Sequence, residues 1–110
     1  MSSDQLQTIS SEQLSDVNGG FAMPAAAHWI MMHESNGNAH AGWAGNPSSS
    51  HPHSAFGAFQ MIAANRKRYM GANWQSTNLQ AQYTAASQYV RSRYGSWNNA
   101  EAFWKQHRWY

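Results

Sequence analysis

The spacing of apolar and polar residues divides this 110-residue chain into two parts. In the first twenty residues the apolar side chains are separated by three, five and three positions, so they fall on one side of a helix with 3.6 residues per turn. Gly19 and Gly20 follow, and glycine is typical of a helix end. The pattern predicts an amphipathic N-terminal helix that stops at this pair. The apolar residues are Leu6, Ile9, Leu14 and Val17.

The remainder of the chain begins with a helix and a long irregular segment. Good helix formers follow Pro24 as far as Ser35. Residues 36–54 are rich in Asn, Gly, Ser and Pro and have no helical periodicity, which predicts a long loop of the kind that is often functional. Residues 55–61 surround a glycine and predict a tight turn, and a basic helix is expected within residues 62–70.

Two further helices are expected towards the C-terminus. The first should begin at Ser76 or Thr77 and end near Tyr94, ahead of a glycine. The second should begin at Ser96 or Asn98, since Asn98 and the glutamate three residues later resemble a capping box. Because no segment shows the two-residue alternation of a strand, the expected fold class is all-α. The buried face of the first of these helices is predicted to carry Leu79, Tyr83, Ala86 and Val90.

Charge follows the same division. The formal net charge is +2, but the first twenty residues hold three of the five acidic residues and no basic one. This segment therefore carries −3 and the remainder +5, which indicates two parts with different roles. The positive part would be drawn to anionic polymers such as peptidoglycan. The chain has no cysteine, so neither a disulfide framework nor a thiolate metal site is expected.

The apolar spacing and the glycine pair resemble the double-glycine leader of bacteriocin and microcin precursors. The resemblance implies that residues 1–20 are a leader, that the peptidase domain of a dedicated ABC exporter cuts after Gly20, and that residues 21–110 are secreted to the periplasm or beyond. Physically, an apolar stripe can dock in a groove, and glycines can pass through a narrow protease cleft. From the pattern alone, an N-terminal helix packed on the domain is equally compatible.

Two carboxylic side chains remain after residue 20, Glu34 and Glu101. Glycosidic bond cleavage needs a proton donor, and a carboxyl group in apolar surroundings is suited to that role because its pKa rises. Glu34 lies in sequence among Trp29, Met31 and Met32, at a helix C-terminus that disfavours negative charge, whereas Glu101 is expected to cap a helix. Glu34 is therefore the candidate catalytic acid; an exposed helix-end carboxylate is the alternative.

Three motifs in order resemble the soluble lytic transglycosylases and related lysozyme-like domains. They are Glu34-Ser35, the turn of residues 55–60 that ends in Gln60, and the run at residues 89–97 with its aromatic tail. The tail is similar to the C-terminal domain of lactobacillar aggregation-promoting factors. The resemblance implies a small lysozyme-like domain that cleaves the MurNAc–GlcNAc bond of peptidoglycan with one glutamate and no cofactor. It leaves open whether the enzyme is a lytic transglycosylase or a muramidase.

The same resemblance implies that polar side chains line a sugar cleft. The alternative for Ser35 is a helix-end hydroxyl bonded to backbone, and the alternative for Tyr94 is a core position. The transglycosylases carry an Ala-Tyr-Asn-x-Gly segment, whereas the nearest segment here, at residues 93–96, lacks the asparagine. The predicted substrate-binding residues are Ser35, Gln60, Gln82 and Tyr94.

Two other clusters are given structural interpretations. Four histidines gather in one region, and two of them flank a proline in a metal-chelating spacing, but no acidic or cysteine ligand accompanies them. We expect solvated histidines and no metal. The basic triplet at residues 66–68 has no nucleic-acid motif around it, so no nucleic-acid partner is expected. The histidines are His33, His40, His51 and His53.

These features favour an exported peptidoglycan-cleaving enzyme, with an antibacterial, bacteriocin-like role as one use of that activity. Its partners would be glycan strands, the exporter and, for an antibacterial role, an immunity protein. A non-catalytic wall-binding or aggregation protein is the first alternative. A membrane-active microcin is the second, and it is weaker because residues 21–110 lack a long amphipathic or apolar helix.

Overall fold

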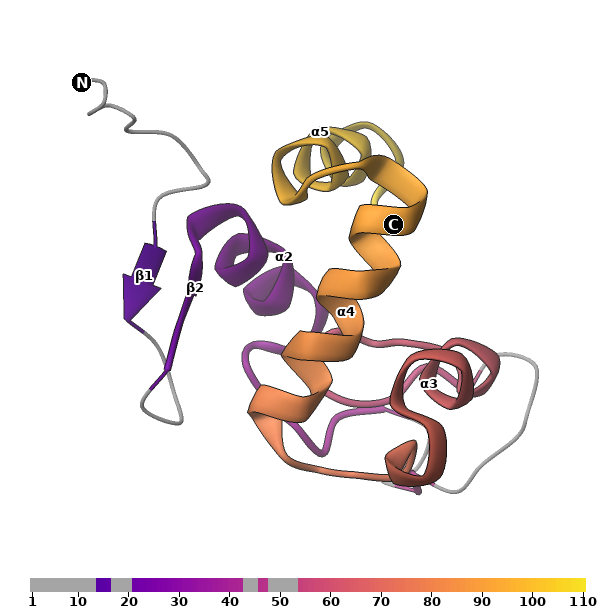
Figure 1. Cartoon of the computed structure of the whole chain (residues 1–110). Coiled ribbons are helices and arrows are strands. Elements are labelled where there is room, and N and C mark those ends of the chain that lie inside the picture. Colours follow the sequence, from indigo (N-terminus) through magenta and orange to yellow (C-terminus); the bar gives the residue numbers. More distant parts are fainter. Residues whose placement is uncertain (1–13, 17–20, 43–45, 48–53) are drawn as a thin grey trace.

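The structure is a computed structural model that describes residues 14–16, 21–42, 46–47 and 54–110. It is mainly helical, which confirms the all-α fold class. Figure 1 shows the long helix α4 in the middle, with α3 beside its N-terminal half and α5 at its C-terminal end. The elements are β1 (Leu14–Asp16), β2 (Ala22–Pro24), α2 (Ala25–Ser35), α3 (Ala63–Met70), the 3₁₀ helix η3 (Gly71–Asn73), α4 (Leu79–Tyr94) and α5 (Trp97–His107).

The N-terminal segment differs from the expected helix. Residues 14–16 form the strand β1, which pairs antiparallel with β2 so that Ser15 lies opposite Met23. The helix prediction is wrong at these residues, and the rest of the predicted helix, with Gly19 and Gly20, lies outside the described residues. A short isolated helix is marginal in water, whereas pairing with β2 gives the backbone of β1 its hydrogen-bond partners.

The predicted start of α2 and the predicted end of α4 are both confirmed. α2 begins after Pro24, whose fixed φ suits a helix start, and it ends at Asn36 in the left-handed conformation. α4 ends at Gly95, whose φ of +87° would be strained for a residue with a side chain but is open to glycine. The turn expected at residues 55–61 also forms, closed by a bridge between Phe56 and Met61.

The helix caps near the C-terminus correct the predictions in part. α4 is capped by Asn78, whose side chain accepts a hydrogen bond of 2.8 Å from Ala81 N, and not by Ser76 or Thr77. Ser76 instead accepts a bond from the Asn78 backbone, one step outside the helix. Serine and asparagine can both cap a helix, but the helical conformation of α4 begins only after Asn78.

The cap of α5 is Ser96, one of the two predicted residues. Its hydroxyl accepts a bond of 3.1 Å from Asn99 N. The alternative box of Asn98 and Glu101 does not form, because Asn98 already lies inside the helix. Glu101 pairs with Lys105 at 2.9 Å, one turn further along α5.

The hydrophobic core lies where α2, the turn of residues 55–61, α4 and α5 meet. α5 packs against both α2 and α4 and so holds these two helices together. The buried face of α4 includes the predicted Ala86 and Val90, but Gln82 and Ala85 are buried as well, while Leu79 and Tyr83 are only half-buried. None of the described helices has both the length and the apolar character that a membrane crossing requires.

Candidate active site

Glu34 lies in the last full turn of α2, where this helix packs against α5. The Nε1–H of Trp104 donates a hydrogen bond of 2.5 Å to Glu34 Oε2. Partial burial raises the pKa of the Glu34 carboxyl, and the Trp104 bond and the positive charge of His33 lower it less than burial raises it. The group thus holds its proton to a higher pH than an exposed glutamate does, as a general acid requires.

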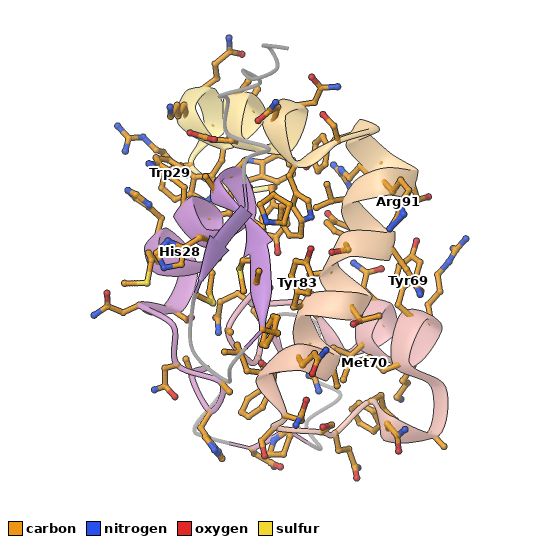
Figure 2. The ribbon with its side chains drawn as sticks, turned by 60° about the vertical axis from the view of Figure 1, so that its left-hand side comes forward. His28, Trp29, Tyr69, Met70, Tyr83 and Arg91 are labelled. Atoms are coloured by element: carbon orange, nitrogen blue, oxygen red, sulfur yellow. The ribbon has the colours of Figure 1, made fainter. Side chains whose placement is uncertain are left out.

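Aromatic rings surround this carboxyl on the α2–α5 side. The rings of Trp29 and His33 stack with their centres 3.7 Å apart, and both meet Trp104 edge-on at 5.2 Å. Figure 2 shows Trp29 where α2 approaches α5, and Lys105 of α5 lies 5.0 Å from the centre of its ring. These rings remove water from one side of Glu34, which is the physical origin of its raised pKa.

Three tyrosines form the opposite side of the site. The hydroxyl of Tyr110 donates a hydrogen bond of 2.7 Å to Phe59 O. Burial raises its pKa well above the usual range, and the negative charge of Glu34 raises it further. The ring of Tyr110 lies 5.6 Å from that of Tyr89 and 6.5 Å from that of Tyr94, centre to centre.

A pocket of about 230 Å³ opens beside these tyrosines. Glu34 is not among the residues that line this pocket; Tyr110 links the two, because it lines the pocket and its pKa is raised by the charge of Glu34. The lining combines amide groups, aromatic rings, a guanidinium and aliphatic side chains, a mixture suited to a polar ring-shaped ligand. It consists of Gln60, Met61, Ile62, Asn65, Tyr89, Arg93 and Tyr110.

Gln60 is the predicted substrate-binding residue whose side chain reaches this pocket. Its backbone is left-handed, with φ +51°, because it completes the turn that follows Gly57. Its Nε2 donates to Ala41 O at 3.1 Å and to Gly57 O at 2.8 Å, so the amide is fixed in orientation while it lines the pocket. The turn thus presents Gln60 beside the pocket.

Gln82 has a different role from the one predicted. It is only 4% exposed, its Oε1 accepts from Ala58 N at 2.9 Å, and its Nε2 donates to Ala39 O and Ser76 O. Both amide hydrogens are therefore used, and the side chain is closed off from any sugar. Gln82 holds the turn of residues 55–61 against α4. Gly57 makes room for it, since a Cβ there would lie 2.8 Å from Gln82 Cδ.

Ser35 also proves to be a structural residue, as its alternative interpretation held. Its hydroxyl lies 2.7 Å from Ala58 O and 3.3 Å from Met31 O, and it accepts a bond of 3.2 Å from Asn38 N. These contacts connect the end of α2 to the same turn that carries Gln60. Because the hydroxyl is bonded to backbone groups, it is not available to a sugar. Ser35 therefore fixes the position of the neighbouring Glu34.

Tyr94 lies behind the pocket rather than on its wall. Its ring contacts Phe103 at 5.1 Å between centres, and its hydroxyl is buried beside the polar groups of Tyr89 and Arg93. Burial, together with the neighbouring Tyr89, raises the pKa of Tyr94 to about 12. The phenol stays neutral and supports the wall that Tyr89 and Tyr110 form.

The remaining predictions about sites fall mostly on undescribed residues. His51 and His53 lie outside the described residues, as do Gly19 and Gly20. Within the described ranges, no three His, Cys, Asp or Glu side chains gather in a way that could hold a metal ion.

Sequence reasoning did not assign Trp104 to the site, although it contacts the candidate acid directly. The two residues are 70 positions apart, so no local pattern links them. The sequence analysis did not assign Arg93 to the site either, although it comes directly before the predicted Tyr94. Its place on the pocket wall depends on how α4 packs against α3. Searches against protein-family models, curated proteins and solved structures give no match for the chain.

Proposed function

We propose that this protein is an exported enzyme that cleaves the MurNAc–GlcNAc bond of peptidoglycan, with Glu34 as its general acid. The observation that carries the proposal is a partly buried carboxyl with a raised pKa, whose charge acts on Tyr110 in the wall of a pocket of about 230 Å³ lined by amides and aromatic rings. This combination supplies a proton donor and a surface on which a sugar ring can stack.

The proposed reaction begins when the Glu34 carboxyl gives its proton to the glycosidic oxygen. The C1–O bond breaks, the leaving sugar keeps the proton, and C1 becomes positively charged and oxocarbenium-like. The Trp104 N–H then stabilises the new Glu34 carboxylate, because a hydrogen bond to an ionised acceptor is stronger than one to a neutral acceptor. This donor is in place before the reaction and needs no rearrangement.

One carboxylate can complete the reaction in two ways. As a base, Glu34 removes a proton either from the substrate's own 6-hydroxyl, which closes a 1,6-anhydro ring, or from a water, which leaves a reducing end. Glu101, the other described carboxylic side chain of the helical domain, is paired with Lys105. This favours a one-glutamate mechanism and leaves lytic transglycosylase and muramidase as the two forms of the proposal.

The test is digestion of purified peptidoglycan by the full-length protein, with the released muropeptides identified by mass. Anhydro-muropeptides support a transglycosylase and reducing ends a muramidase. Glu34→Gln should abolish release, while Glu101→Gln, which removes the same charge from a paired residue, should retain it. Release that is undiminished in Glu34→Gln contradicts the assignment of the acid.

Export through a double-glycine leader is a separate part of the proposal. Its support is the sequence spacing before Gly19 and Gly20 and the change from −3 to +5 on either side. Co-expression with a peptidase-bearing ABC exporter should release residues 21–110 to the medium or periplasm. Gly19→Val and Gly20→Val should each block the cut, and a cut that persists in both variants contradicts the boundary. An antibacterial role would add an immunity protein as a partner.

A second candidate, a non-catalytic wall-binding protein, is favoured by the cations held over aromatic rings near the site. Arg108 lies 5.8 Å from the centre of the Trp104 ring and Lys105 lies over Trp29. Such surfaces attract anionic polymers and stack with sugars. Salt-sensitive sedimentation with peptidoglycan sacculi, without any muropeptide release by the unmodified protein, would favour this candidate over the enzyme.

A further inference from the structure

We propose that the pocket beside Glu34 recognises a carboxylate carried by the sugar it binds, and that Arg93 is the residue that recognises it. The inference rests on the proposed function, because it concerns a ligand bound next to the proposed catalytic acid. It adds a specificity: a sugar that bears an acidic substituent is preferred to a neutral one.

Aromatic neighbours hold the guanidinium of Arg93 in place, but no carboxylate of the described residues neutralises its charge. Its guanidinium lies 5.5 Å from the ring centres of both Tyr94 and Trp109, so two aromatic side chains fix its orientation beside the pocket. In the part of the chain that the structure describes, the ion pair is Lys105–Glu101, and no carboxylate pairs with Arg93. A guanidinium held in this way keeps its planar donor groups available for a carboxylate of a ligand.

Arg66 shows the contrast within the same fold. It is 2% exposed, and its donors reach the backbone oxygens of Met61, Pro47 and Ser54 at 2.6–2.9 Å. These bonds use the hydrogen-bond donors of Arg66 within the protein. Arg93 is exposed and lines the pocket; one of its donors contacts the Tyr94 hydroxyl, and the others remain for a ligand.

The other pocket residues suit the rest of a sugar of this kind. The amide hydrogens of Gln60 are used within the protein, but its Oε1 can accept from a sugar hydroxyl or N-acetyl N–H, and the amide of Asn65 can bond the same groups. The rings of Tyr89 and Tyr110 offer faces on which a pyranose can pack. No acidic side chain is among the residues that line the pocket. The chemistry of the wall therefore matches an N-acetylated sugar with a carboxylate substituent.

In peptidoglycan that carboxylate has two sources. One is the lactyl ether group of muramic acid once the stem peptide has been removed, and the other is the carboxylates of an attached stem peptide. Neutral N-acetylglucosamine oligomers carry neither. Three soluble probes separate these cases: chito-oligosaccharides, glycan strands stripped of peptides, and glycan strands that retain their peptides.

The experiment measures the dissociation constants of these probes with full-length Glu34→Gln protein, in which cleavage is prevented. We expect a carboxylate-bearing probe to bind roughly tenfold more tightly than the neutral oligomer, the size of one charge-assisted contact. Tighter binding of the stripped strands identifies the lactyl group, and tighter binding of the peptide-bearing strands identifies the stem.

Added to this background, Arg93→Gln should remove the preference, and Arg93→Lys should restore part of it. The matched control is Arg91→Gln, an equal loss of charge on the same helix from a residue that lines a different hollow, with Ser87 and Trp97. Thermal unfolding confirms that each variant is folded.

Equal affinity for all three probes, a preference that survives Arg93→Gln, or an equal loss in Arg91→Gln each overturns the proposal. These results are distinct from failure of the proposed function, in which the unmodified protein releases no muropeptides although the preference and its loss in Arg93→Gln are observed.

Discussion

The indole N–H of Trp104 and the carboxyl of Glu34 meet at 2.5 Å across the contact between α5 and α2. This bond joins the last helix to the candidate catalytic residue. It stabilises the ionised form of Glu34 and so opposes the effect of burial, which favours the protonated form. The balance of the two sets the pH at which Glu34 can act as an acid.

Trp104→Phe should move the alkaline limb of the pH–activity profile to higher pH. The substitution removes a bond that lowers the pKa of Glu34, so the carboxyl keeps its proton further into the alkaline range. The measurement is muropeptide release as a function of pH. Trp97→Phe is the matched control, because Trp97 is also buried but its N–H bonds Ser87 Oγ at 3.2 Å. A limb that moves equally in both variants, or to lower pH in Trp104→Phe, contradicts the assignment.

Glu34→Gln should become more stable relative to the unmodified protein as pH rises. The pKa of Glu34 is raised in the folded state, so the folded protein binds the proton more tightly than the unfolded chain. Stability from this group is fully present below the unfolded pKa of about 4.5 and is lost as pH rises through the folded value. Glutamine stays neutral and escapes this loss.

The measurement is urea unfolding of the two proteins at several pH values. Their difference in unfolding free energy should change in favour of Glu34→Gln above pH 4.5 and be constant below it. Glu101→Gln is the control for removal of a negative charge, since Glu101 is also only partly exposed and is paired with Lys105 on the same helix. A difference that does not vary with pH contradicts the raised pKa.

Gln82→Leu should lower the free energy of unfolding by about 2–4 kcal/mol. Leucine leaves Ala58 N, Ala39 O and Ser76 O without the partner that Gln82 now provides in a buried position. Gln88→Leu, at an exposed position of the same helix, should change stability by less than about 0.5 kcal/mol. Denaturant unfolding measures both. Equal stability of the two variants would show that the turn of residues 55–61 does not depend on Gln82.

Arg66→Lys should destabilise the fold by about 2 kcal/mol or more, although it keeps the charge. A single ammonium group cannot span the carbonyls of Met61, Pro47 and Ser54 that the planar guanidinium reaches. Arg68→Lys, at an exposed neighbouring position, should have little effect. Urea unfolding compares the two. Similar midpoints in both would mean that Arg66 acts through its charge and not through its geometry.

Local sequence patterns predicted the helices well and the site only in part. Glycine at position 95 and proline at position 24 mark helix boundaries by their own backbone preferences, and both boundaries form as predicted. Both short strands differ from the expectation of no strand, since β1 and β2 depend on pairing with each other and not on their own periodicity.

Within the site, the apolar neighbours of Glu34 in sequence correctly indicated its raised pKa. Its partner Trp104 could not be found in this way, because the contact depends on helix packing between distant segments. Gln82 was misassigned for a related reason. A polar side chain expected in a cleft can instead be buried, and only the fold shows that the Gln82 amide bonds the backbone.

The pairing of β1 with β2 has a consequence for the order of events in the proposed export. A cut after Gly20 falls between the two strands, so it would convert an internal hairpin into a new chain end at Phe21 and remove the neighbour of β2. Met23, which is fully buried, would then lie within three residues of a free amino group. Precursor and product would thus be two different structures at this edge. Peptidase cleavage would serve as a maturation step that decides what may next pair with β2.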